Sequence, residues 1–187
     1  MRVIAGTGRG IKLFAPTGVT TRPTSDRVKE ALFSILASQI DFADVRVLDI
    51  CAGTGSLGIE ALSRGGGLCC FIESNQSVKA ILEKNLLVSR CQSRSEIVSM
   101  DAIKALALIA GRGRRFDLAF FDPPYDSGLY RPVIEALDAA ALLTPGAILV
   151  AECSVRKPLS GVYGGLKHFD RRVYGDTALE FFIQEEK

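Results

Sequence analysis

The 187-residue sequence predicts an α/β fold with a doubly wound, mostly parallel sheet of seven strands. Three observations support this fold class. Short apolar runs recur along the chain, and segments with helical periodicity separate them. The runs are apolar throughout, which is typical of strands covered on both faces of a parallel sheet. The last two runs are joined by a short turn and are expected to pair as an antiparallel hairpin.

The predicted elements follow one another from residue 45 onward. Strands are expected over residues 45–50, 68–73, 96–100, 116–122, 147–153, 167–174 and 177–184. Helices are expected near residues 57–64, 75–90, 102–110 and 129–142.

An N-terminal extension precedes this alternation. Apolar runs at residues 3–5 and 11–14 flank the turn-rich segment 6–10, which predicts a hairpin. Thr24 or Ser25 can cap a following helix whose apolar positions include Val28 and Leu32. We therefore expect one domain, residues 1–187, with an extension over 1–40 and a core over 41–187.

Charge is distributed unevenly along the chain. The net charge is +2, but residues 1–30 hold six basic and two acidic side chains, a local charge of +4. Such a patch is typical of a polyanion-binding surface, with simple solvation as the alternative. The candidate contacts to the polyanion are Arg2, Arg9, Lys12, Arg22 and Arg27.

Five cysteines and a single histidine predict no zinc site, because no Cys-x-x-Cys spacing occurs. We expect all five thiols to be reduced. The sequence shows neither a signal peptide nor an apolar stretch long enough to span a membrane, so a cytoplasmic location is expected.

A glycine-rich segment follows the first core strand and opens a helix. Gly53, Gly55 and Gly58 match Gly-x-Gly-x-x-Gly, and Glu73 lies 20 residues beyond Gly53, where an acid would bind ribose hydroxyls. This pattern is compatible with NAD and with S-adenosylmethionine. Asp49 favours the second, since a carboxylate at the strand end suits a cationic methionine moiety better than a pyrophosphate.

Asp101 follows the third strand, at the same edge of the predicted sheet. Its carboxylate could accept a hydrogen bond from an adenine amine while the N–H of Ala102 reaches the ring. Capping of the next helix is the competing role, and the two could coexist.

Asp122-Pro123-Pro124-Tyr125 follows the fourth strand. The prolines hold the backbone extended, so carbonyls near Asp122 and Pro123 are left without helical partners. Together with the Asp122 side chain they could accept both hydrogens of an exocyclic amine while Tyr125 packs on the base. The alternative is a simple strand-ending turn.

With these two motifs the chain resembles class I S-adenosylmethionine-dependent methyltransferases, which have a Rossmann-like fold and modify exocyclic amines of nucleic-acid bases. The resemblance to the RsmD family is closer and covers essentially the whole chain. It rests on the segments 2–6, 9–10, 21–24, 26–33, 57–65 and 174–177.

The resemblance implies methylation of the N2 amine of a guanine in 16S rRNA, of the guanine(966)-N2 type. We expect a monomer that acts on a small-subunit particle, with protein-free rRNA as the alternative substrate. It implies S-adenosylmethionine as cofactor and catalytic roles for Asp122, Pro123 and Tyr125. Three alternatives remain at this point: a DNA adenine-N6 methyltransferase, an NAD-dependent oxidoreductase and a non-catalytic RNA-binding protein.

Overall fold

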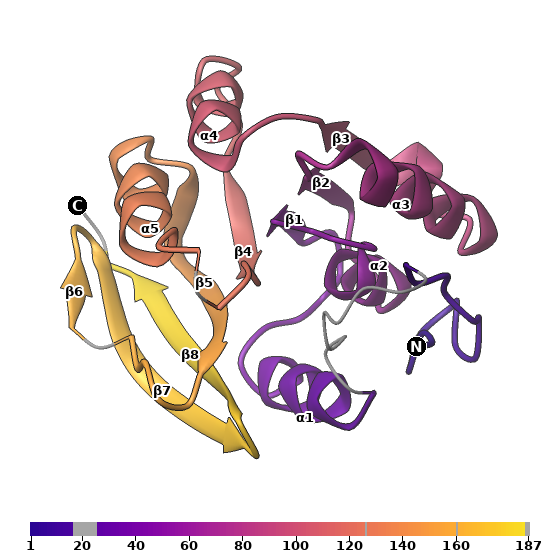
Figure 1. Cartoon of the computed structure of the whole chain (residues 1–187), viewed down its shortest axis with the longest axis horizontal. Helices are drawn as coiled ribbons and strands as arrows, with labels where there is room; N and C mark the ends of the chain where they lie inside the picture. Colours follow the sequence, from indigo (N-terminus) through magenta and orange to yellow (C-terminus); the bar gives the residue numbers. More distant parts are fainter. Residues whose placement is uncertain (17–25, 126, 160, 186–187) are drawn as a thin grey trace.

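A central eight-stranded sheet organises the chain. The computed structural model describes residues 1–16, 26–125, 127–159 and 161–185. The strand order is β3-β2-β1-β4-β5-β8-β7-β6 (Figure 1). The strands are β1 Arg46–Ile50, β2 Leu68–Ile72, β3 Ser95–Val98, β4 Phe116–Phe121, β5 Leu143–Ser154, β6 Val162–Tyr163, β7 Leu166–Tyr174 and β8 Thr177–Gln184.

The first five strands are parallel, and the last three are antiparallel to their neighbours. The predicted count of seven strands is wrong, because Val162 and Tyr163 form β6 beside the start of β7. Two residues are too few to show the alternation by which a strand is predicted. The final hairpin is confirmed, and it places β8 between β5 and β7.

Helices cover both faces of the sheet, as Figure 1 shows. They are α1 Asp26–Ala37, α2 Ser56–Ser63, α3 Gln76–Val88, α4 Ala102–Ala110 and α5 Tyr130–Ala139, with a 3-10 turn η1 at Gln92–Arg94. One apolar core lies under α4 and α5, and the other lies under α1, α2 and α3. The central parallel strands are mostly apolar on both faces because neighbouring side chains enter opposite cores: Val47 packs towards α2, and Leu48 towards α4.

The predicted N-terminal hairpin is not confirmed. Arg2 and Lys12 form one isolated antiparallel bridge, and Val3 N–H donates to the Ile11 carbonyl at 2.9 Å, but neither segment is a strand. The N–H groups of Ile4 and Ala5 donate instead to the Glu60 carboxylate of α2, at 2.7 and 3.0 Å. Gly10 N–H donates to the Val3 carbonyl at 2.9 Å and Leu13 N–H to the Met1 carbonyl at 3.1 Å. The N-terminal segment, residues 1–14, is thus paired with itself near its ends and also bonded to α2.

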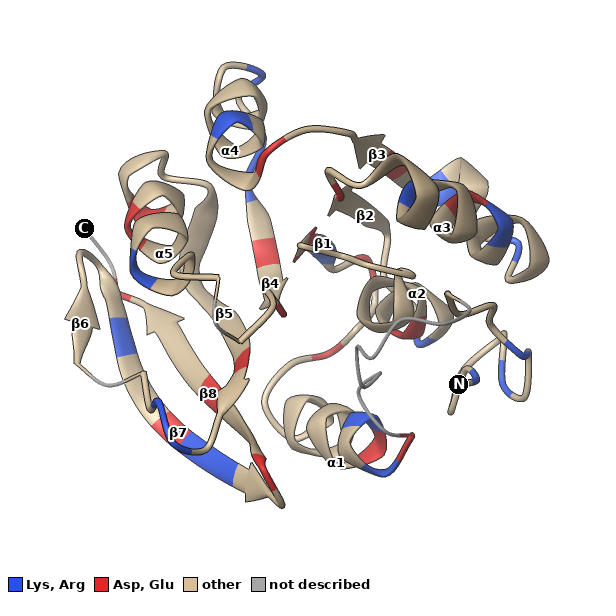
Figure 2. Cartoon of the chain, viewed as in Figure 1, with Lys and Arg blue, Asp and Glu red and all other residues tan. Residues whose placement is uncertain are grey.

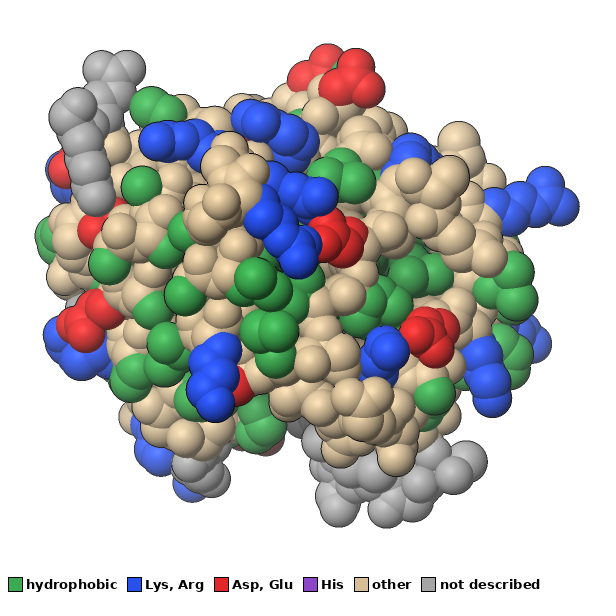
Figure 3. All heavy atoms as spheres, turned by 90° about the horizontal axis from the view of Figure 1, so that it is seen from above, with side chains coloured by type: hydrophobic (Ala, Val, Ile, Leu, Met, Phe, Trp, Pro, Cys, Tyr) green, Lys and Arg blue, Asp and Glu red, His purple; other side chains and the backbone are tan. Residues whose placement is uncertain are grey.

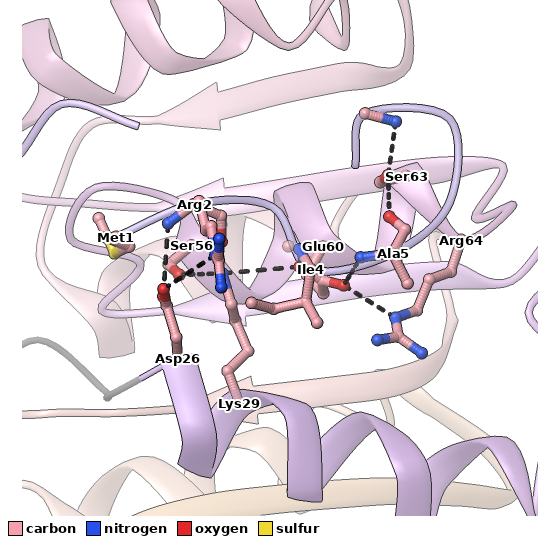
Figure 4. Close-up of polar contacts among 12 residues, drawn as sticks. Met1, Arg2, Ile4, Ala5, Asp26, Lys29, Ser56, Glu60, Ser63 and Arg64 are labelled. Carbon is pink, nitrogen blue, oxygen red and sulfur yellow. Dashed lines mark hydrogen bonds and ion pairs between the residues drawn. The ribbon is translucent and has the colours of Figure 1, made fainter. Parts of the chain in front are cut away.

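A buried ion pair lies beneath this segment (Figure 4). Lys29 of α1 and Glu60 of α2 approach to 3.6 Å, and both side chains are completely enclosed. Arg64 donates to the same carboxylate at 2.9 Å. Burial lowers the pKa of Lys29, and the charge of Glu60 partly offsets this effect. Every oxygen of Glu60 therefore has a donor, as a buried charge requires.

The expected helix caps Thr24 and Ser25 lie outside the described residues. All five cysteines carry free thiols, in agreement with the sequence-based expectation. Within the residues that the structure describes, none of the helices is long and apolar enough to cross a membrane.

Candidate active site

The parallel strands bring the candidate residues to one edge of the sheet. Ile50 at the end of β1 lies opposite Ile72 of β2 and Phe121 of β4, and Ile72 lies opposite Val98 of β3. The segments that follow these strand ends therefore meet at one place, the carboxyl edge, where open α/β sheets bind ligands.

The glycine-rich loop connects β1 to α2 through left-handed backbone conformations. Cys51, Gly53 and Gly55 have φ of 59°, 55° and 79°. The loop is closed by Ala52 N–H donating to the Ile72 carbonyl at 2.9 Å and Gly55 N–H donating to the Ala52 carbonyl at 2.8 Å. A non-glycine residue in the left-handed region is unusual, so Cys51 marks a strained turn that its surroundings hold in place.

Gly58 and Gly53 have different surroundings. A Cβ at Gly58 would lie 2.4 Å from Phe71 and 2.6 Å from the sulfur of Cys69, so its absence lets α2 pack against β2. Among the residues that the structure describes, a Cβ at Gly53 would meet only its own loop, the Cys51 carbonyl at 4.0 Å. The described part of the chain therefore leaves space beside Gly53, and α2 begins directly behind it.

Glu73 bridges two elements of the site. One carboxylate oxygen accepts from Gly53 N–H at 2.9 Å and the other from Asn75 N–H at 2.7 Å. Asn75 in turn caps α3. Glu73 thus fixes the glycine loop against the start of α3 while its remaining lone pairs can accept from ribose hydroxyls.

Asp49 is enclosed, with 2% of its surface exposed, and its carboxylate accepts from Gly58 N–H at 2.9 Å. Burial raises the pKa of Asp49 to about 8, the Gly58 N–H opposes this, and the charge of Glu73 adds to it. The structure places Asp49 beneath the glycine loop, and its contact with a cationic methionine group stays a prediction. The geometry gives Asp49 the task of fixing the loop to α2.

Asp101 caps α4, since its side chain accepts from the N–H groups of Ile103 and Lys104 at 3.0 and 3.3 Å. The capping role that competed with adenine binding is therefore present. Asp101 is nevertheless exposed. Ala102 is the first residue of the helix, where an N–H has no intrahelical acceptor.

Four carboxylates of the site lie close enough to Cys51 to affect the pKa of its thiol. Burial raises its pKa to about 12, with further contributions from the charges of Glu73, Asp122, Asp49 and Asp101. These four carboxylates come from the ends of β1, β2, β3 and β4. The structure thus brings the predicted acidic residues together around the glycine loop.

The Asp122-Pro123-Pro124-Tyr125 motif begins where β4 ends. Asp122 N–H donates to the Ile50 carbonyl at 3.4 Å, which ties the motif to the residue before the glycine loop. Asp122 is half-buried, Pro123 is buried and Pro124 is exposed. Pro124 also accepts from Ser127 N–H at 3.0 Å, so a turn follows the prolines. The turn and the proposed binding role are compatible.

Tyr125 is anchored by residues that sequence reasoning missed. Its hydroxyl lies 2.8 Å from the Thr177 hydroxyl of β8 and donates to Glu152 of β5 at 3.2 Å. Burial raises the pKa of Tyr125 to about 12. Tyr130 of α5 donates to the Glu152 carbonyl at 3.0 Å. A carboxylate within the apolar run 147–153 was the available signal for Glu152, whereas Thr177 was noted only as the end of segment 174–177, without a role.

The basic candidates lie on the N-terminal segment and at the start of α1 (Figure 2). The exposed residues are Arg2, Arg9, Lys12 and Arg27. Arg2 forms an ion pair with Asp26 at 3.4 Å, and its side chain stays 64% exposed. The backbone of Arg2 forms the isolated β-bridge with Lys12. Arg22 lies outside the described residues. On the face seen in Figure 3, Lys and Arg side chains are interspersed with acidic and apolar ones.

Comparison with known proteins agrees with this arrangement. The chain matches the family described as Conserved hypothetical protein 95 over residues 1–183. Ribosomal RNA small subunit methyltransferase D of Escherichia coli (strain K12) is 34% identical over 185 residues, which cover 99% of this chain and 90% of that protein. The protein of the same name from Haemophilus influenzae is 38% identical, covering 85% of this chain and 81% of that protein.

A solved structure of the Escherichia coli protein yhhF superposes with a TM-score of 0.86 and 32% identity, covering 100% of this chain and 99% of that one. The fold and the carboxyl-edge site define a class I S-adenosylmethionine-dependent methyltransferase, as the sequence predicted. The chain belongs to the RsmD family, which the sequence resemblance also indicated.

Proposed function

We propose that this chain transfers a methyl group from S-adenosylmethionine to the exocyclic N2 amine of a guanine in 16S rRNA, of the guanine(966)-N2 type. The observation that carries the proposal is the meeting of the Asp122-Pro123-Pro124-Tyr125 motif with the glycine loop, through the Asp122 N–H and the Ile50 carbonyl. The names of its relatives support rRNA as the substrate.

The residues of the carboxyl edge fit the cofactor. When bound, S-adenosylmethionine supplies an electrophilic methyl group on a sulfonium. We assign Gly53 and Gly55 to backbone contacts with it, Glu73 to the ribose hydroxyls, and Asp101 with Ala102 to the adenine. Asp49 belongs to the cofactor site through the Gly58 N–H that it accepts. The open space beside Gly53 supports this assignment.

The acceptors of the motif would activate the guanine amine. Its lone pair is delocalised into the ring, so the free amine is a poor nucleophile. Hydrogen bonds to Asp122 and to the Pro123 carbonyl favour a pyramidal nitrogen and stabilise the positive charge that develops during attack. Tyr125 would stack on the base, which contributes about 1–3 kcal/mol in comparable contacts. Holding the nitrogen in line with the methyl supplies further acceleration.

RNA would enter with the target guanine unstacked, because a paired base cannot reach such a pocket. Arg2, Arg9, Lys12, Arg22 and Arg27 would contact phosphates. We further propose that residues 1–40 form the RNA-contacting extension and 41–187 the catalytic core, and that a cytoplasmic monomer acts on a small-subunit particle.

The test uses methyl-labelled S-adenosylmethionine with unmethylated small ribosomal subunits, protein-free 16S rRNA and duplex DNA in parallel. Nuclease digestion then identifies the labelled nucleoside. We expect N2-methylguanosine from rRNA. Label in N6-methyladenosine of DNA would support the adenine methyltransferase instead, and no label in any substrate would refute both.

The Asp122→Ala variant separates chemistry from cofactor binding. We expect it to lose turnover, since the amine loses its charged acceptor, and to keep its affinity for S-adenosylhomocysteine, measured by calorimetry. A variant that stays fully active would show that Asp122 is not the acceptor.

A further inference from the structure

Asn85 of α3 bonds to the N-terminal segment and to the glycine loop at once. Its Oδ1 accepts from Phe14 N–H at 2.7 Å, and its Nδ2 donates to the Phe14 carbonyl at 3.0 Å and to the Thr54 carbonyl at 2.9 Å. The residue is completely enclosed. Both amide hydrogens and one acceptor lone pair of Asn85 therefore lie between these two segments.

Lys29 provides a second connection. Its ammonium donates to the Arg2 carbonyl at 2.6 Å and to the hydroxyl of Ser56 at 3.1 Å (Figure 4). The Thr54 hydroxyl also lies 3.8 Å from the sulfur of Met1. Contacts from the N-terminal segment thus end on residues on either side of Gly55, at the start of α2.

These contacts join two segments to which we assign different roles, the glycine loop and the N-terminal segment. Thr54 lies between Gly53 and Gly55 in the loop assigned to the cofactor. The other end is the segment that carries Arg2, Arg9 and Lys12. A buried amide with all these bonds loses partners if either segment shifts, and an unsatisfied buried polar group is costly. Moving either the N-terminal segment or the glycine loop therefore breaks hydrogen bonds of Asn85 and costs free energy, unless the other segment moves with it.

We propose that Asn85 is a positioning residue that links RNA binding at the N-terminal segment to cofactor binding at the glycine loop, with Lys29 and Ser56 as a second link. This inference rests on the proposed function. Because linkage is reciprocal, RNA should raise the affinity for the cofactor by the same factor as the cofactor raises the affinity for RNA.

Calorimetry of S-adenosylhomocysteine binding tests the linkage. The Kd is measured with and without saturating unmethylated small ribosomal subunits, and the ratio of the two values is the linkage factor. We expect a ratio above about 5 in the unmodified protein, within the usual range of coupling between sites. The ratio should fall towards one in Asn85→Leu, which is close in size but makes none of the three hydrogen bonds.

The matched control is Glu83→Gln on the same helix, where Glu83 forms an exposed pair with Lys79 at 3.3 Å. Its ratio should equal that of the unmodified protein. A change that lowers stability alone would affect both Kd values alike and leave the ratio unchanged. Equal ratios in the unmodified protein and in folded Asn85→Leu would overturn the proposal.

If Asn85→Leu does not fold, Ser56→Ala decides, because it removes a single hydroxyl from the second link. Its ratio should fall below that of the unmodified protein, and an unchanged ratio overturns the proposal.

The labelling test and the linkage test together separate the two proposals. Methyl label in the RNA together with a ratio near one refutes the linkage alone. A ratio above 5 that Asn85→Leu abolishes, without any label in the RNA, supports the linkage and refutes the proposed function. No label and a ratio near one refute both.

Discussion

The hydroxyl of Tyr125 bonds to two neighbouring strands, β5 through Glu152 and β8 through Thr177. A ring held at its outer end cannot swing freely, and a base that stacks on it meets a surface already in place. Pre-organisation of this kind lowers the entropic cost of binding. The aromatic face and its anchor can be separated by mutation.

We predict that Tyr125→Phe lowers kcat/KM for rRNA roughly 5- to 150-fold, since it removes two hydrogen bonds that typically contribute about 0.5–1.5 kcal/mol each. Tyr125→Ala should lose more, because it removes the stacking face as well. Single-turnover and steady-state assays with labelled S-adenosylmethionine measure both effects. Equal losses in the two variants would show that the hydroxyl, not the ring, is the important group.

Asp49 predicts a pH dependence of stability. Its pKa is raised from 3.8 to about 8 by burial, so between these values the folded state binds more protons than the unfolded state. Stability then falls as pH rises, with a slope of at most about 1.4 kcal/mol per pH unit for one proton.

Asp49→Asn should remove this component of the slope. Urea unfolding at several values between pH 5 and pH 8 measures it, and a variant whose slope matches that of the unmodified protein would contradict the prediction.

At the scale of elements, the β1–α2 connection combines a packing contact with a binding surface. Gly58 faces Phe71 and Cys69, which are fully buried and cannot move away, whereas Gly53 faces open space. Both glycines belong to one short sequence pattern, but their surroundings differ.

Gly58→Ala should therefore lower the free energy of unfolding by about 1–3 kcal/mol, as expected for overpacking. Gly53→Ala also carries a cost, because its φ of 55° is left-handed. Its larger effect should be a loss of S-adenosylhomocysteine affinity. Urea unfolding and calorimetry on both variants distinguish these results. A larger loss of affinity in Gly58→Ala than in Gly53→Ala would contradict the prediction.

The sequence predicted the elements whose signal is local. Strand β2 is a continuous apolar run, β1 and β4 are apolar apart from Arg46, Asp49 and Asp117, and the Pro residues after Asp122 end β4 where expected. The two strands of the expected N-terminal hairpin are not confirmed, because the segments pair only near Arg2 and Lys12 and the N–H groups of Ile4 and Ala5 bond to Glu60, more than fifty residues away along the chain. No local pattern reports such a partner.

In the candidate site, too, residues with a local sequence signal were predictable, and residues that act through distant segments were not. Glu73 and Asp122 were predictable because each follows a strand end at the carboxyl edge. Asn85 and Thr177 were not, since their roles depend on segments that only the folded chain brings together. Lys29 did carry a signal, because it precedes Leu32 and Phe33 by three and four residues and so lies on the apolar face of α1.

At the scale of the whole molecule, Glu60 joins the N-terminal segment, α1 and α2. We predict that Glu60→Gln lowers the free energy of unfolding by about 3–5 kcal/mol, because it leaves Lys29 as a buried charge without its anion. Urea unfolding at pH 7 measures the loss.

Glu135→Gln is the matched control, because Glu135 forms an exposed pair with Arg131 at 2.8 Å. Exposed pairs of this kind contribute little, about 0.3–0.5 kcal/mol at helical spacing. Losses of the same size in the two variants would contradict a special role for the enclosed pair.

The position of β8 inside the sheet affects which parts of the fold can form first during synthesis. β8 is the last strand in sequence order, yet it lies inside the sheet, so β5 keeps an unpaired edge until residues 177–184 have left the ribosome. Exposed edges invite pairing with other chains. Thr177, which anchors Tyr125, begins this same strand. A nascent chain can therefore form the glycine loop early, but Tyr125 gains its anchor on Thr177 only when β8 has been made.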